Sequence, residues 1–292
     1  MTENAETGFI EQETRKRTFY GLDALRGIAA AVVVTRHAPA LFGIGLFPNS
    51  SLGVDLFFVM SGFVIAHAYD QRIEKGLNWR QFLVIRAIRL YPLYLLGTAI
   101  GAASAAATLL TGVRSAQTGL EWHAVDLLTS FGLSLFLLPS PQFAGVDSLY
   151  PLNAVAWSLA FEVVVNVLFA AFHRFLTNRV LLAAMLVSGA LLILATFRLG
   201  DVDIGWNWSN VLPGFTRVFY SFPAGVLLYR LWNDGRLRLA SNILVPIVVT
   251  IAVFAVDLPM AGRLSFSLLA VLFVFPAVTI LARCRRLSPT PW

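Results

Sequence analysis

The sequence GLDALRGIAAAVVVTRH, residues 21–37, opens the first long apolar run of the chain. An α-helix turns about 100° per residue, so positions eleven apart return to within about 20° of one face and lie about 16 Å apart along the axis. Arg26 and His37 therefore share one face, and Asp23 lies close to the same stripe. Charged side chains in a membrane are costly and tend to face a polar cavity, so the stripe predicts a functional site. The alternative is an ion pair that only joins helices.

The composition places this helix in a membrane protein. Of the 292 residues, 58% are hydrophobic and 13% are charged, and the mean hydropathy is +0.73. Soluble domains have about 25% charged residues. The single cysteine, Cys284, excludes an intramolecular disulfide. Because a span needs about 20 apolar residues, we predict an all-α polytopic transmembrane bundle with eight spans, at residues 24–45, 52–69, 90–111, 152–173, 180–199, 212–231, 240–257 and 264–282.

A ninth apolar run, 126–138, is too short to cross and favours a re-entrant segment. The basic residues support this topology, since Lys and Arg collect on the cytoplasmic side of a membrane. With a cytoplasmic tail at 1–20 and no crossing at 126–138, that side carries 16 of the 22 basic residues: Arg15, Lys16, Arg17, Arg72, Lys75, Arg80, Arg86, Arg89, Arg174, Arg179, Arg230, Arg236, Arg238, Arg283, Arg285 and Arg286. The net charge of +6 then indicates orientation in the bilayer and contact with anionic lipid, not nucleic acid.

Four motifs follow one another along the chain. They are Gly21-Leu-Asp-Ala-Leu-Arg26 with His37, Gly53-Val-Asp55-Leu-Phe-Phe-Val-Met-Ser61-Gly62, Phe82-Leu-Val-Ile-Arg86-Ala-Ile-Arg89-Leu-Tyr-Pro92, and Ala156-Trp157-Ser158-Leu-Ala-Phe-Glu162, with a weaker fifth at Arg217-Val-Phe-Tyr-Ser-Phe-Pro223. In this order and spacing the chain resembles the acyltransferase-3 family of integral membrane acyltransferases over about residues 19–230. The resemblance implies a protein of the bacterial inner membrane that moves an acyl group, often acetyl, from cytoplasmic acyl-CoA to a hydroxyl of an envelope glycan or lipid-linked sugar.

The ionisable residues of these motifs suit acyl transfer. A hydroxyl acceptor needs a base, and the imidazole of His37 titrates near neutrality. Glu162 lies about 16 Å into its span, where it orients His37, relays a proton, or only pairs with Arg36 or Arg217. We expect Arg26, His37 and Glu162 to converge on one polar cavity.

Two arginines are candidates for the donor site. Arg86 and Arg89 are one turn apart at the predicted cytoplasmic end of their span, where the planar guanidinium suits the phosphates of acyl-CoA. Anchoring by positive charge is the alternative. Arg26 either holds a CoA phosphate or pairs with Asp23, which is also a candidate to orient His37. Acetyl-CoA is the expected donor, and no metal is expected.

The predicted outer loop 200–211 carries Asp201, Asp203, Trp206 and Trp208. Its tryptophans suit either anchoring at the membrane interface or stacking on a glycan. Asp55, near the outer end of the second span, is a further candidate to line the acceptor side. Ser61 stands beside Gly62, and such a pair eases helix packing more often than it supplies a nucleophile.

Two alternatives to an active acyltransferase remain open at this stage. The family resemblance implies two further spans, whereas this sequence stops at Trp292, so we expect one membrane domain over 21–292 that is short at its C-terminal end. A truncated, non-catalytic family member is therefore one alternative. A small-molecule transporter is the other; transporters favour inverted repeats with broken helices, and no repeat is visible in the sequence.

Overall fold

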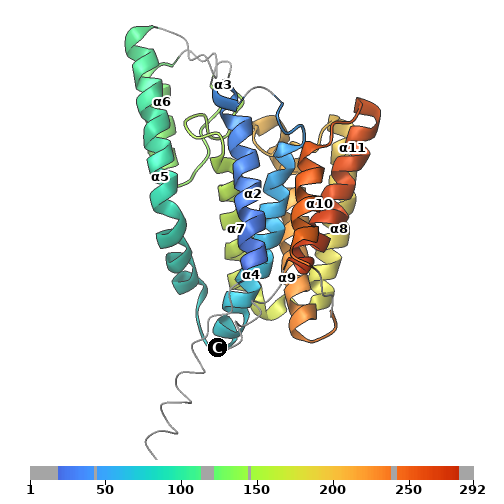
Figure 1. Cartoon of the computed structure of the whole chain (residues 1–292). Helices are drawn as coiled ribbons and strands as arrows, with labels where there is room; N and C mark the ends of the chain where they lie inside the picture. Colours follow the sequence, from blue (N-terminus) through green and yellow to red (C-terminus); the bar gives the residue numbers. More distant parts are fainter. Residues whose placement is uncertain (1–18, 43–44, 113–121, 144–145, 238–241, 283–292) are drawn as a thin grey trace, which may run out of the picture.

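The computed structural model describes residues 19–42, 45–112, 122–143, 146–237 and 242–282. Most of the predicted tail at 1–20, Arg114, and the basic residues after 282 lie outside these ranges. Within them the chain is helical, with two isolated β-bridges and no strand. The helices are α2 (Tyr20–His37), α3 (Pro39–Phe42), α4 (Gly53–Glu74), α5 (Trp79–Thr111), α6 (Ala124–Ser134), α7 (Ala156–Phe172), α8 (Asn178–Leu199), α9 (Val211–Asn233), α10 (Leu244–Ala255), α11 (Met260–Leu269) and α12 (Phe275–Leu281), the last two joined by a π-helical turn, Ala270–Val274 (Figure 1).

The predicted all-α polytopic bundle is confirmed. Six helical segments in the described part of the chain are long and apolar enough to cross a membrane: Ser50–Glu74, Trp79–Thr111, Ala156–Phe175, Asn178–Leu199, Trp208–Asn233 and Gly262–Leu281. Helices α2 and α10 stand in the bundle at the two other predicted spans but are shorter than predicted. Figure 1 shows both helices packed among the long ones.

Helix α2 ends at His37, although the apolar run continues to residue 45. The cause is Pro39, because the residue before a proline is disfavoured in the helical conformation. Ala38 accordingly leaves the helix, with φ −127° and ψ 56°. His37 therefore lies at the end of a helix, with an exposed side chain. The predicted span 24–45, which would place His37 in the interior of a helix, is therefore wrong in its end point.

The predicted re-entrant run forms α6 and a turn. Helix α6 has 11 residues, about 16 Å of length, which is about half of a hydrocarbon core of roughly 30 Å. It packs along α5, where the Tyr94 hydroxyl donates to the Ser134 carbonyl at 2.6 Å. Figure 1 shows these two helices side by side at one edge of the molecule. The chain leaves α6 through a turn at Leu137, which has a positive φ of 57°; that this segment does not cross the membrane stays a prediction.

Helices α4 and α9 form the centre of the bundle. Gly62 and Gly225 allow their close approach, because a Cβ at Gly62 would lie 2.1 Å from the Phe222 carbonyl oxygen and one at Gly225 would lie 2.0 Å from that of Val59. Any larger residue at either position would force the two backbones apart. The centre of the bundle is thus a rigid frame for the helices around it.

Ion pairs join α4 and α9 at both ends. At one end Arg217 donates to both oxygens of Asp55, at 3.0 and 2.6 Å, and both side chains are fully buried. Asp55 is thus a buried structural partner of Arg217, and the expectation that it lines the acceptor side is wrong. At the other end Arg230 donates to Asp70, which also contacts His173 at 2.8 Å. Since a buried charge is tolerated only when it is paired and hydrogen-bonded, these contacts fix the register of α4 against α9.

Candidate active site

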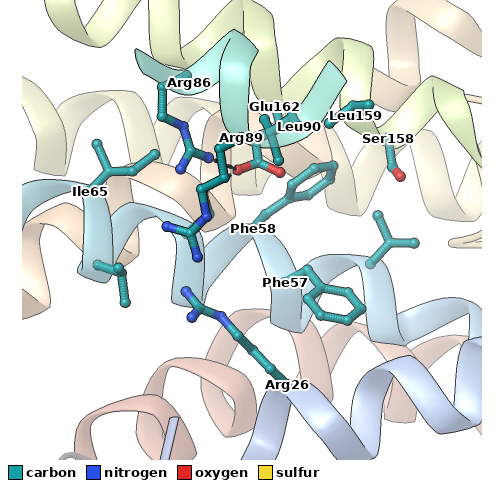
Figure 2. Close-up of a pocket in the computed structure, with 13 residues that line it drawn as sticks. Arg26, Phe57, Phe58, Ile65, Arg86, Arg89, Leu90, Ser158, Leu159 and Glu162 are labelled. Carbon is teal, nitrogen blue, oxygen red and sulfur yellow. Dashed lines mark hydrogen bonds and ion pairs between the residues drawn. The ribbon is translucent and has the colours of Figure 1, made fainter. Parts of the chain in front are cut away.

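A cationic cavity of about 330 Å³ lies between α2, α4, α5 and α7. Each helix supplies polar side chains: Arg26 comes from α2, Ser61 from α4, Arg86 and Arg89 from α5, and Glu162 from α7. Apolar residues of α4, α5 and α7 complete the wall. Figure 2 shows the three guanidinium groups turned toward a common space beside Glu162. We call this space the arginine cavity.

Glu162 is held by two neighbours in the arginine cavity. Arg86 donates to its Oε1 at 2.8 Å, and the Ser61 hydroxyl donates to the same oxygen at 2.6 Å. The side chains of Arg86 and Glu162 are only 11% and 19% exposed. The sequence suggested Arg36 or Arg217 as the partner of Glu162, and both suggestions are wrong. Because the carboxylate binds Arg86, it fixes that guanidinium in the wall.

The arginine cavity carries more positive than negative charge. Three arginines and one glutamate line it. Asp23 lies 3.4 Å from Arg26 on the same helix, but it is 57% exposed. Within the described residues, Arg89 has no ion-pair partner, and the buried Nε of Arg86 has no hydrogen-bond acceptor. Buried donors are rarely left unsatisfied, so this wall is complementary to an anion with several acceptor oxygens.

A second cavity, of about 800 Å³, lies near the end of α2. It is lined by His37 and Arg36, by Trp157 of α7, by Asp203 and Trp206 of the loop between α8 and α9, and by Asp257 and Arg263 near α11. We call it the histidine cavity. Its walls combine aromatic faces with hydrogen-bonding groups of both charges, a mixture that suits a polar, hydroxyl-rich molecule.

Asp203 ties the loop to α2. Its carboxylate accepts from Arg36 at 2.5 Å, and its other oxygen lies 3.6 Å from the buried Arg217. The Trp206 indole donates to the Asp203 carbonyl at 3.1 Å. These contacts hold the loop in place, so it forms an ordered wall of the histidine cavity beside His37. The sequence marked this loop for its aspartates and tryptophans but did not indicate which helix it would contact.

The predicted site residues divide between these two cavities. Arg26, Arg86, Arg89 and Glu162 meet in the arginine cavity, whereas His37 lines the histidine cavity. The expectation of a single cavity is therefore wrong for His37. Arg26 and His37 are eleven positions apart, about 16 Å along α2, and the two side chains face different spaces along one stripe. Sequence reasoning did not assign Ser61 to the site, because a Ser-Gly pair is more typical of helix packing.

Comparison with known proteins defines the class of this protein. A family model described as an acyltransferase domain, Acyl_transf_3, matches residues 19–289. The chain therefore belongs to the acyltransferase-3 family of integral membrane proteins. No solved structure matches the chain.

Two curated proteins from rhizobia are similar to it. Protein 2 in picA locus of Rhizobium radiobacter is 37% identical over 182 residues, which are 61% of this chain and 94% of that protein. The exopolysaccharide production protein ExoZ of Rhizobium meliloti (strain 1021) is 29% identical over 226 residues, which are 77% of this chain and 61% of that protein. The similarity to ExoZ thus spans less than two thirds of its length.

Proposed function

We propose that this protein transfers an acyl group, most simply acetyl, from acyl-CoA to a hydroxyl of an exported polysaccharide or its lipid-linked precursor. The observation that carries the proposal is the unbalanced positive charge of the arginine cavity. Acyl-CoA is an anion with several phosphates, and arginine binds two phosphate oxygens at once. Membership of the acyltransferase family supports the reaction, and the name of ExoZ supports a polysaccharide as acceptor.

In this proposal the donor binds from the cytoplasm. Arg26, Arg86 and Arg89 lie in the first halves of α2 and α5, whose beginnings are the ends that the basic residues assign to the cytoplasmic side of the bacterial inner membrane. Phosphates of CoA bind Arg86, Arg89 and Arg26, with Glu162 holding Arg86 in place. The extended pantetheine arm is about 15–20 Å long. This length is close to the distance of about 16 Å along α2 from Arg26 to His37, so the arm can reach from one cavity to the other.

The acceptor binds in the histidine cavity. Its volume of about 800 Å³ lies in the usual range of ligand sites, and Trp157 and Trp206 offer apolar faces to a sugar ring. His37 takes the proton of the acceptor hydroxyl as its oxygen attacks the thioester carbonyl. The C–S bond then breaks, the ester forms, and the proton passes to the departing thiolate to give CoA.

The test uses the full chain in detergent or nanodiscs with radiolabelled acetyl-CoA and a panel of rhizobial exopolysaccharides and lipid-linked oligosaccharides. We expect CoA binding that weakens with salt, as phosphate contacts do, and label on at least one acceptor. CoA binding without transfer to any acceptor would favour the non-catalytic alternative. Absence of CoA binding would refute the assignment of the arginine cavity.

A further inference from the structure

The arginine and histidine cavities meet at Val54. Of the residues that line the two cavities, Val54 of α4 is common to both. Towards the start of α4, Ser50 and Ser51 line only the histidine cavity. Beyond Val54, Phe57 and Ser61 line only the arginine cavity. The partly exposed side chain of Val54 thus stands at the boundary between the two spaces.

Helix α7 also contributes to both cavities. Trp157 lines the histidine cavity, and the next residue, Ser158, lines the arginine cavity. We call the boundary between the two cavities, marked by Val54 on α4 and by the step from Trp157 to Ser158 on α7, the layer. On α4 this layer lies seven residues from Ser61, about 10 Å. A chain bound by its phosphates near Ser61 reaches the layer with its distal end.

On the α7 side of this layer, two contacts hold the ring of Trp157. The Trp157 ring lies 5.3 Å from the guanidinium carbon of the buried Arg217. On another side it packs against Gly205, where a Cβ would come within 2.9 Å of the ring. Trp157 is therefore fixed by its surroundings. On α4 the boundary is marked by Val54, whose side chain is small, β-branched and partly exposed.

We propose that Val54 sets the length of the acyl group that this protein transfers. The inference rests on the proposed function, since it needs acyl-CoA to extend from the arginine cavity towards His37. The thioester then reaches the layer from the arginine cavity, so that the acyl group beyond its sulfur is the part of the donor that passes Val54. The geometry selects short acyl groups such as acetyl, because a longer chain meets the methyl groups of Val54.

Substitutions at Val54 test this inference, with acetyl-, propionyl- and butyryl-CoA as donors. Val54→Ala removes both methyl groups, and we expect the ratio of kcat/KM for butyryl-CoA to that for acetyl-CoA to rise at least about tenfold, the lower value for one methylene in an apolar pocket. Val54→Leu should lower transfer from butyryl-CoA before it lowers transfer from acetyl-CoA. Val64→Ala is the matched control, because Val64 lies on the same helix and lines only the arginine cavity.

The outcomes separate this inference from the proposed function. An unchanged butyryl-to-acetyl ratio in Val54→Ala, with normal turnover of acetyl-CoA, would overturn the role of Val54 and leave the proposed function intact. An equal rise in Val64→Ala would also overturn it, since the effect would then not belong to the boundary. If the unsubstituted protein transfers no acyl group from any of the three donors, the proposed function falls and the role of Val54 falls with it.

Discussion

Arg89→Gln isolates the contribution of one cation to donor binding. Arg89 lines the arginine cavity and has no ion-pair partner in the described part of the chain. Its removal therefore leaves no buried charge without a partner. A hydrogen bond between charged groups contributes about 1.5–3 kcal/mol, and because Arg89 is exposed the lower value applies. About 1.5 kcal/mol corresponds to roughly a tenfold increase in the Kd for CoA.

The assay is calorimetric titration of free CoA into the purified full chain at two salt concentrations. The substituted protein should also lose part of the salt dependence, since one phosphate contact is gone. Arg80→Gln is the control, because Arg80 lies on the same helix, is exposed, and packs against Trp79 outside the cavity. An unchanged affinity in Arg89→Gln, or an equal loss in Arg80→Gln, would refute a specific role for the arginine cavity.

Three further predictions concern the frame and the site. Glu162→Gln removes the charge that holds Arg86 and should lower acyl transfer at least about tenfold while the protein still inserts; a full rate would show that the ion pair is only structural. Arg217→Met leaves Asp55 buried without its partner and should destabilise the protein by about 3–5 kcal/mol, measured by thermal unfolding in detergent; an unchanged Tm would contradict the structural role of this pair. Gln142→Cys should react with a membrane-impermeant thiol reagent added outside the cell, since Gln142 is exposed in the loop after α6; reaction only from the cytoplasm would reverse the topology.

Hydropathy predicted the helices that are long and apolar. Helices α7, α8 and α9 begin and end within a few residues of the predicted spans. Helix α5 begins at Trp79, eleven residues before its predicted span, because its first turns are amphipathic and are capped by the side chain of Asn78. Hydropathy registers the apolar part of a helix, whereas capping and local hydrogen bonds decide where it begins.

The charged residues of the arginine cavity could be identified as site candidates from the sequence, because charged residues within spans are costly and seek one another or a cavity, but their meeting in one cavity without His37 was not predicted. The ion-pair partner of Glu162 could not be predicted from the sequence. Glu162 contacts Arg86 only because α5 and α7 turn these faces towards each other, and a single sequence contains no direct signal for that packing. The separation of His37 from Glu162 follows from the end of α2 at His37, for which Pro39 was a local signal.

The most direct test of the account is the effect of His37→Ala on acetyl transfer from acetyl-CoA to an acceptor that the unsubstituted protein modifies. Loss of a general base lowers a rate by about 10²–10⁴, and we expect a loss in this range with an unchanged Kd for CoA. Thr35→Ala is the matched control, since Thr35 also lines the histidine cavity but its hydroxyl donates only to the Val32 carbonyl of its own helix; it should retain most of the activity. Full activity of His37→Ala would contradict the account, because the acceptor hydroxyl would then lose its proton to a group other than His37.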